Sequence, residues 1–133
     1  MVYLDASAIY KLIVEECESR LLRDFLAEHS RRASSALARV EVKRALLRTH
    51  SLNLRREYAG VILGQINLLA ISDAILSQAG VVGAPELRSL DAIHLATALS
   101  VPELEGMVVY DHRLARAAEA MGLRVWAPGQ NPA

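Results

Sequence analysis

Hydrophobic and polar positions follow two different patterns along this chain. Short apolar runs such as Met1–Leu4 and Met107–Tyr110 are typical of buried strands. Longer segments place apolar residues three or four apart, which predicts amphipathic helices. These patterns predict strands at 1–5, 32–34, 107–110 and 123–126, a short helix that starts at about Ser7, and longer helices at 19–29, 35–50, 54–67, 73–80, 90–100 and 112–121. Segment 68–71 fits either a strand or a helix end.

Strands that alternate with helices predict a parallel sheet covered on both faces, which is a three-layer α/β/α domain. Small polar residues mark the expected helix starts, because their side chains accept hydrogen bonds from free backbone N–H groups. The expected starts are Ser7, Ser35, Ser72 with Asp73, Ser89 and Asp111. Pro102 and Gly122 are expected to end the last two helices.

Length and composition predict one soluble domain. The 133 residues are 53% apolar, which is ample for one core, and we expect a single domain over 1–133 with a short tail at 127–133. The most apolar stretch, 58–71, is interrupted by Gln65 and Asn67 and is too short and polar to span a bilayer. No secretory leader is recognisable, and the single Cys17 fits a reducing compartment, so we expect a cytoplasmic protein.

The charges are unevenly distributed although the net charge is zero. Residues 20–56 hold ten Lys or Arg and three Asp or Glu, a net of +7, so the rest of the chain carries −7. An anionic partner for the basic segment and a set of solvated helix faces explain this asymmetry equally well.

Two acids follow directly on predicted strands. Asp5 comes after the first strand and Asp111 after the strand at 107–110. Open α/β sheets bind ligands at the carboxyl ends of their strands, so both acids are well placed for a functional site. The alternative is that each is only a turn or helix-cap residue.

Two further acids lie in predicted helices. Asp91 lies in the first turn of a helix that is apolar almost all round, and a buried carboxylate there must be paired or bound to metal. His94, one turn on, is more typical of a hydrogen-bonded core residue than of a ligand. Glu41 shares a helix face with Arg44 and Arg48, so an i,i+3 ion pair with Arg44 is a structural alternative to a role in a site.

The four acids together are stronger evidence for a functional site than each acid is alone. If the fold brought them within about 5 Å of one another, each pair would repel by roughly 3 kcal/mol at an effective dielectric constant of 20. A bound cation would reverse the sign of that energy. Oxygen ligands alone favour Mg²⁺ or Mn²⁺ over zinc.

Several segments resemble the PIN-domain ribonucleases, in particular the VapC-type toxins of bacterial toxin–antitoxin modules. The resemblance covers about residues 2–127, and its most specific part is the third segment. The matching segments are Val2–Ser7, Glu41 within its helix, Leu87–Ala96 and Val109–Leu114.

The resemblance implies a five-stranded parallel sheet and a Mg²⁺-dependent endoribonuclease, with Mn²⁺ as a substitute, acting on tRNA or ribosomal RNA. It also implies a cognate VapB-type antitoxin and a homodimer. Asp5, Glu41, Asp91 and Asp111 fall on the family's four acid positions, as catalytic and metal-binding residues, and Ser7 matches the small hydroxyl residue after the first acid. Many members carry Thr or Ser where this chain has Val109, so one supporting hydrogen bond is not expected here.

Basic side chains near these acids are candidates to hold the RNA backbone. They are Arg39, Lys43, Arg44, Arg48 and Arg113. A docking surface for the antitoxin is expected to be apolar, but core packing explains the best candidates equally well; these are Leu12, Ile13, Leu21, Leu22, Phe25 and Leu26.

Other functions fit the sequence less well. A haloacid-dehalogenase-like phosphatase needs a second Asp at the position of Ser7, and a receiver domain needs a late lysine, whereas the two lysines are Lys11 and Lys43. No glycine-rich phosphate loop follows the first strand, which disfavours a Rossmann cofactor site. The principal alternative is a non-catalytic RNA- or protein-binding module of the same fold.

Overall fold

A computed structural model describes residues 1–49 and 53–130. Five strands and seven helices are found in the described residues. In chain order they are β1 (Val2–Leu4), α1 (Ala6–Ile13), α2 (Ser19–Ala27), β2 (Arg32–Ser35), α3 (Ala38–Arg48), α4 (Asn53–Gly64), β3 (Asn67–Leu69), α5 (Asp73–Ala79), α6 (Ser89–Leu99), β4 (Gly106–Val108), α7 (His112–Ala120) and β5 (Val125–Trp126).

All strand pairs of the sheet are parallel, and the spatial order is β3-β2-β1-β4-β5. The chain moves outward from β1 through β2 to β3, then crosses to the other side of β1 for β4 and β5. The order therefore reverses between β1 and β4, and such a switch point is where open α/β sheets bind ligands. Leu4 pairs with Val108 in register, so the segments that leave both strands emerge side by side.

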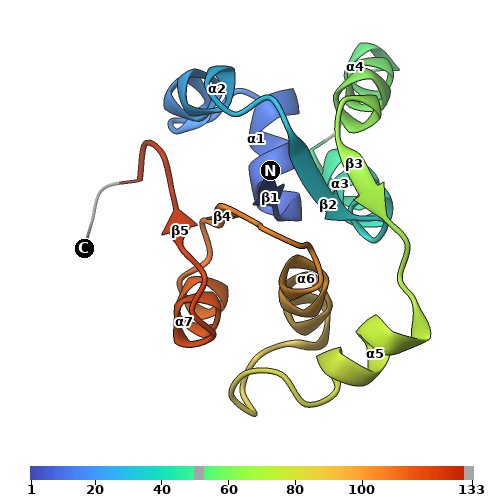
Figure 1. Cartoon of the computed structure of the whole chain (residues 1–133). Coiled ribbons are helices and arrows are strands. Elements are labelled where there is room, and N and C mark those ends of the chain that lie inside the picture. The colour runs from blue at the N-terminus through green and yellow to red at the C-terminus, as the bar shows by residue number, and fades with distance from the viewer. Residues whose placement is uncertain (50–52, 131–133) are drawn as a thin grey trace.

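Helices cover both faces of the sheet, with α1 to α4 on one side and α5 to α7 on the other (Figure 1). Side chains alternate across a strand, so Leu4 packs under α1 to α4 while Tyr3 and Met107 pack against α6 and α7. The three-layer α/β/α architecture with five parallel strands is thus confirmed. Within the described residues, no helix has the length and apolar character needed to cross a bilayer.

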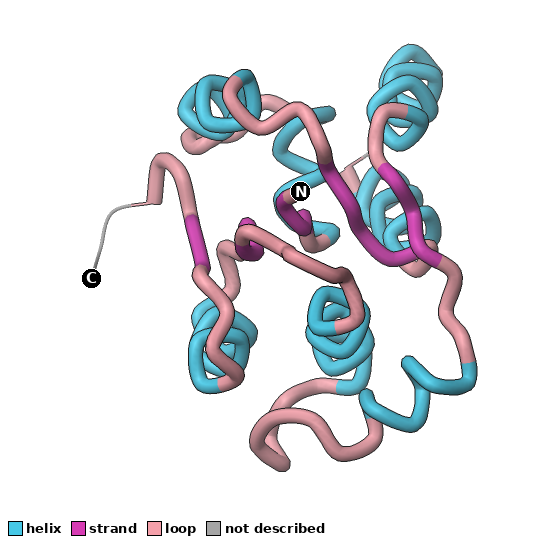
Figure 2. Tube along the Cα trace, viewed as in Figure 1, coloured by secondary structure: helices cyan, strands magenta, loops and turns pink. Residues whose placement is uncertain are grey.

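The strands are short and the helices long, as Figure 2 shows. Segment 68–71, for which the sequence allowed two interpretations, contributes to the edge strand β3 at Asn67–Leu69. The helix expected over 54–67 therefore ends earlier, at Gly64. Position 50, the expected end of the preceding helix, and positions 131–133 of the expected tail lie outside the described residues.

Helix starts were predicted with mixed success. Ser72 and Asp111 are N-caps whose side chains accept hydrogen bonds from Ile75 N and Leu114 N, as expected. The predictions for Ser7 and Ser35 were wrong: Asp5 caps α1, and Ser35 is the last residue of β2. Ser89 is the first residue of α6 rather than its cap, which is Arg88.

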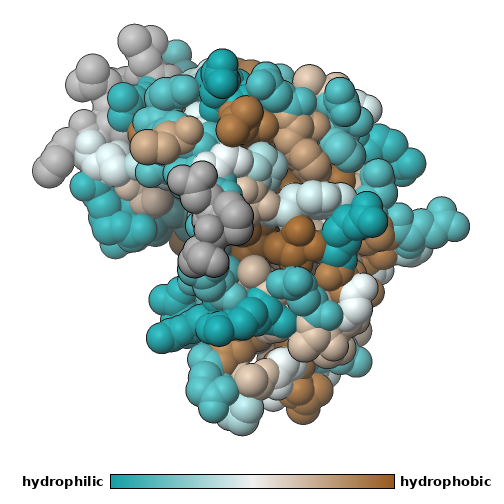
Figure 3. All heavy atoms as spheres, turned by 90° about the vertical axis from the view of Figure 1, so that its left-hand side faces the viewer, coloured by the Kyte–Doolittle hydropathy of each residue, from teal (hydrophilic) through white to brown (hydrophobic). Residues whose placement is uncertain are grey.

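The face formed by α2, β5 and α7 shows hydrophobic side chains in its centre between hydrophilic ones (Figure 3). Near this face, Phe25 of α2 stacks on His29, with ring centroids 4.2 Å apart, and also contacts the ring of Trp126 of β5 at a tilt. Four of the six apolar residues considered for antitoxin docking are buried core residues, namely Leu12, Ile13, Leu22 and Leu26. Core packing accounts for those four, whereas Leu21 is 45% exposed.

Candidate active site

The sheet topology places Asp5 and Asp111 at the same edge. Asp5 follows β1 directly, and its backbone N–H donates to the carbonyl of Val108 at 3.3 Å. Asp111 lies three residues beyond the end of β4 and caps α7. Both acids therefore lie at the carboxyl ends of the two strands that flank the switch point.

Asp5 is a buried carboxylate held on one oxygen. Its Oδ1 accepts hydrogen bonds from Ser7 Oγ at 2.8 Å and from Ala8 N at 3.0 Å. The pKa of Asp5 is raised to about 6, and burial is the largest cause. The two hydrogen bonds lower this pKa, and the negative charge of Asp91 raises it. Both of these hydrogen bonds use Oδ1, so Oδ2 is the oxygen available to a ligand.

Asp91 and Asp111 extend the acidic site. Asp91, in the first turn of α6, accepts a hydrogen bond from Arg88 Nε at 3.3 Å. Burial raises the pKa of Asp91; Arg88 lowers it and the charge of Asp111 raises it. Asp5, Asp91 and Asp111 therefore form a series of carboxylates in which each acts electrostatically on the next.

Glu41 is held by a buried histidine instead of by Arg44. His94 Nε2 lies 2.6 Å from Glu41 Oε1, and His94 Nδ1 lies 2.7 Å from the hydroxyl of Tyr3. His94 and Tyr3 are almost completely buried, while the side chain of Glu41 is 21% exposed. The interpretation of His94 as a hydrogen-bonded core residue is confirmed.

The four acids thus frame one region, but each has a local partner in this structure. Among residues 1–49 and 53–130, no three His, Cys, Asp or Glu side chains form a group that could hold a metal ion as they stand. A cation would have to compete with Ser7, Arg88 and His94 for carboxylate oxygens. The set contains only oxygen donors and includes Asp5, a buried carboxylate with a raised pKa, so its chemistry fits a hard divalent cation.

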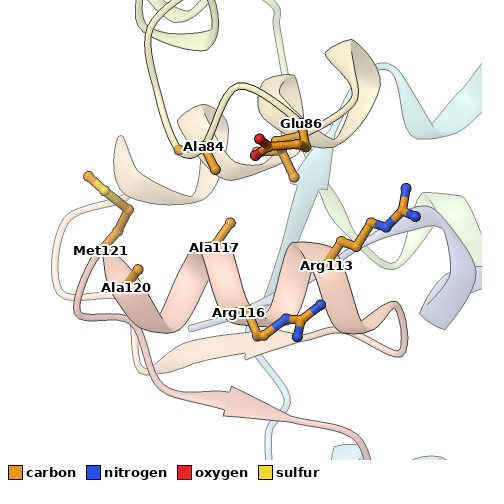
Figure 4. A pocket seen from close by; sticks show the side chains of 9 residues that line it. Ala84, Glu86, Arg113, Arg116, Ala117, Ala120 and Met121 are labelled. Carbon is orange, nitrogen blue, oxygen red and sulfur yellow. The ribbon is translucent and has the colours of Figure 1, made fainter.

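All five basic candidates for RNA binding are exposed. Arg44 and Arg48 follow Glu41 along one face of α3, whereas Lys43 lines a small cavity between α3 and α4. Arg113, in the first turn of α7, lines a groove of about 830 Å³. Figure 4 shows Arg113 and Arg116 on one wall of this groove, with Glu86 on the other.

Three residues that contact the acids, contact His94 or line the groove could not be recognised from the sequence pattern. Tyr3 looked like an ordinary strand residue, Arg88 carried no signal, and Arg116 is one of many exposed helical arginines. The spacing of Asp91 and His94 was the only available hint, because residues three apart lie on neighbouring parts of one helix surface.

A family model described as the PIN domain matches residues 2–120. This chain belongs to the PIN-domain family. It is 44% identical to the ribonuclease VapC46 of Mycobacterium tuberculosis, over 96% of this chain and 97% of the relative. It is also 44% identical to the ribonuclease VapC35 of the same species, over 98% of each chain. The expected resemblance to VapC ribonucleases is therefore confirmed, and nucleases of this family generally depend on divalent metal ions.

Solved structures share the fold at lower identity. The VapC20 toxin of M. tuberculosis, described as cleaving the sarcin–ricin loop, superposes with a TM-score of 0.73 at 14% identity, over 93% of this chain and 97% of the other. A toxin–antitoxin complex from Klebsiella pneumoniae gives a TM-score of 0.72 at 20% identity, over 96% and 98%. VapBC2 of Rickettsia felis, bound to a promoter DNA fragment, gives 0.65 at 13% identity, over 95% and 98%.

Proposed function

We propose that this protein is a Mg²⁺-dependent endoribonuclease toxin that cleaves structured cellular RNA, with Asp5, Glu41, Asp91 and Asp111 as its acidic site. The observation that carries the proposal is the placement of Asp5 and Asp111 at the carboxyl ends of the strands that flank the switch point, with Asp91 near both in the first turn of α6. Repulsion among these carboxylates is unfavourable for folding. The arrangement becomes favourable only when a bound cation attracts each of the carboxylates.

The chain's own residues have distinct roles in this proposal. Asp5 and Asp91 are the principal ligands of the cation, and Asp5 offers Oδ2 because Ser7 and Ala8 hold Oδ1. Asp111, fixed as the cap of α7, and Glu41 complete the site and orient the attacking water. When bound, the cation neutralises charge on the scissile phosphate and activates water for attack. Hydrolysis by water leaves 5′-phosphate and 3′-hydroxyl ends.

The metal requirement is tested with purified protein, RNA and either Mg²⁺ or EDTA. We expect cleavage with Mg²⁺ or Mn²⁺ and loss of cleavage with EDTA, and end-labelling should find 5′-phosphates. Asp91→Asn should lower the rate by about 10²–10³-fold, the usual effect of removing one electrostatic group from such a site. Undiminished cleavage in EDTA, or cyclic phosphate ends, would contradict the proposal.

The groove beside α7 is the proposed path of the RNA backbone. It begins next to the acids, because Asp111 precedes Arg113 by two residues, and the loop with Glu86 leads into the helix of Asp91. Arg113 and Arg116 provide two guanidinium groups, which suit phosphate oxygens. The apolar part of the groove, with Leu87 and Met121, suits the faces of unpaired bases.

Replacing Arg116 should weaken RNA binding without removing the site. For Arg116→Gln we expect a raised KM with little change in kcat, because Arg116 lines the groove and is not one of the four acids of the proposed site. The slope of log K against log salt should fall by about 0.7 for each phosphate group that the variant no longer binds. Arg20→Gln is the matched control, because Arg20 is exposed on α2, which lies on the opposite side of the sheet from α7 (Figure 1). Equal KM values and salt slopes for Arg116→Gln and the wild type would rule out this path.

The protein partners are proposed from the family. A VapB-type antitoxin would neutralise the toxin, and a homodimer is the expected assembly. Exposed apolar side chains on α3 and α4 support a protein-binding surface there; they are Val40, Leu47, Tyr58 and Val61, each at least 47% exposed.

A further inference from the structure

A buried chain of hydrogen bonds links the sheet to the candidate active site. It runs from Tyr3 in β1 through His94 in α6 to Glu41 in α3, over sequence separations of 91 and 53 residues. The two rings meet edge to face, with centroids 5.8 Å apart and planes at 75°. Three separate elements are thus tied together by polar groups inside an otherwise apolar interior.

The direction of the hydrogen bonds follows from their chemistry. An ionised carboxylate can only accept, so His94 Nε2–H donates to Glu41 Oε1. The Nδ1 atom of a neutral imidazole is then unprotonated and accepts from the hydroxyl of Tyr3. Tyr3 suits this donor role, because its burial raises the pKa of the phenol and keeps the hydroxyl protonated. The carboxylate of Glu41 therefore sets the tautomer of the histidine, and the phenol of Tyr3 donates to the other ring nitrogen, so the ring is held between these two groups.

The hydrogen-bonded chain involves two helices that carry acids of the site. His94 lies three residues after Asp91 on α6, and its Nε2 atom lies 2.6 Å from Oε1 of Glu41 on α3. Beside Tyr3, the hydroxyl of Ser34 is completely buried without a well-formed hydrogen bond, yet it is close enough to lower the pKa of Tyr3. Apolar residues of similar volume would tie the elements together without the cost of burying these groups, so packing alone is a poor reason for the chain.

We propose that Tyr3 and His94 are positioning residues that hold the carboxylate of Glu41 in one orientation at the edge of the acidic site. This inference rests on the proposed function, because it assigns a task to Glu41 within that site. With Oε1 held by His94, Oε2 is the oxygen of Glu41 that is left free of this hydrogen bond for a cation or a water molecule. Polar partners of this kind typically change metal affinity or activity by 10–100-fold.

The test compares His94→Leu, which removes both ring nitrogens, with His94→Gln, whose amide can still donate to Glu41. Leu95→Met is the control, since Leu95 is a completely buried neighbour on the same helix that packs within an apolar cluster. Mn²⁺ affinity is measured by calorimetry on samples shown to be folded by circular dichroism, and kcat and KM are measured with RNA. We expect His94→Leu to bind Mn²⁺ at least 10-fold more weakly and to lower kcat rather than raise KM. His94→Gln should recover most of the Mn²⁺ affinity and most of kcat, and Leu95→Met should match the wild type in these two quantities.

A second readout needs no metal. Ring ¹⁵N chemical shifts should show His94 of the wild type as a single tautomer with its proton on Nε2. Tyr3→Phe keeps the aromatic ring and loses only the hydroxyl, and it should shift these signals even if His94→Leu fails to fold. Unchanged signals in Tyr3→Phe, or a folded His94→Leu with wild-type Mn²⁺ affinity and kcat, would overturn the inference. A wild-type protein that binds no Mn²⁺ would refute the proposed function instead, while the expected response of Tyr3→Phe would still uphold the hydrogen bond by which Tyr3 holds the ring of His94.

Discussion

Replacing Asp5 with Asn should abolish most RNA cleavage and, in the absence of metal, make the protein more stable. Asn has the same shape and its Oδ1 can still accept from Ser7 and Ala8, so the start of α1 is preserved. The charge that the cation needs is lost, and we expect a fall in kcat of about 10²–10³-fold or more. Activity on RNA and thermal unfolding in EDTA measure the two effects in one preparation.

The expected stabilisation depends on pH in a defined direction. Burial raises the pKa of Asp5 from 3.8 to about 6, so the unfolded chain ionises first as the pH rises. The contribution of protonated Asp5 to the free energy of unfolding is fully present below about pH 3.8. It is lost progressively as the pH rises through about 6. At about pH 7.5 the ionised carboxylate of Asp5 lowers the free energy of unfolding by about 3 kcal/mol relative to a neutral group. The Asp5→Asn variant avoids this cost, so the difference in Tm should be several degrees at about pH 7.5 and should vanish near pH 4.

A surface acid in a similar local position serves as the control for Asp5. Asp73 is exposed in the first turn of α5, and Asp73→Asn should change neither cleavage nor the metal-free Tm by a comparable amount. Added Mg²⁺ should stabilise the wild type but not Asp5→Asn, because only the folded wild type binds the ion. Retained cleavage, or a lower Tm of the Asn variant in EDTA at mildly alkaline pH, would show that Asp5 serves only as a helix cap.

The positions of the acids along the fold could be predicted because they depend on local pattern and topology. Short apolar runs indicate strands, and the carboxyl ends of parallel strands meet at one edge. Asp5 and Asp111 follow such runs, so their placement at that edge required no knowledge of side-chain packing. The layer of helices on each face of the sheet follows from the same alternation.

The hydrogen-bond partners of the acids could not be predicted, because they depend on which helices pack together. An i,i+3 pair of Glu41 with Arg44 was reasonable from the sequence, yet packing of α3 near α6 brings His94 within 2.6 Å of Glu41. A buried, fixed imidazole competes well against a flexible surface arginine, whose ion pair is weakened by water and side-chain entropy. The same limit applies to helix starts, since Asp5 lies two residues before Ser7 and takes the capping role.

The largest loss of stability is expected from Gly106→Ala, at the beginning of β4. A methyl group there would lie 2.5 Å from the carbonyl oxygen of Arg124 and 2.6 Å from the ring of Trp126. The carbonyl cannot move aside, because it accepts from Met107 N at 2.9 Å where β5 begins to pair with β4. Overpacking of this kind costs about 1–3 kcal/mol and occasionally more, and contact with backbone places this site at the upper end. Chemical denaturation measures the change in the free energy of unfolding.

Gly60→Ala is the matched control, because the same substitution there should have the opposite sign. Gly60 lies inside α4, and a methyl group there would meet nothing within 4 Å. Alanine is favoured over glycine in a helix interior by about 1 kcal/mol, so Gly60→Ala should stabilise the protein. If both variants changed stability alike, glycine flexibility rather than the Trp126 contact would explain position 106. Because β4 leads to Asp111, Gly106→Ala should also lower Mn²⁺ affinity, whereas Gly60→Ala should leave it unchanged.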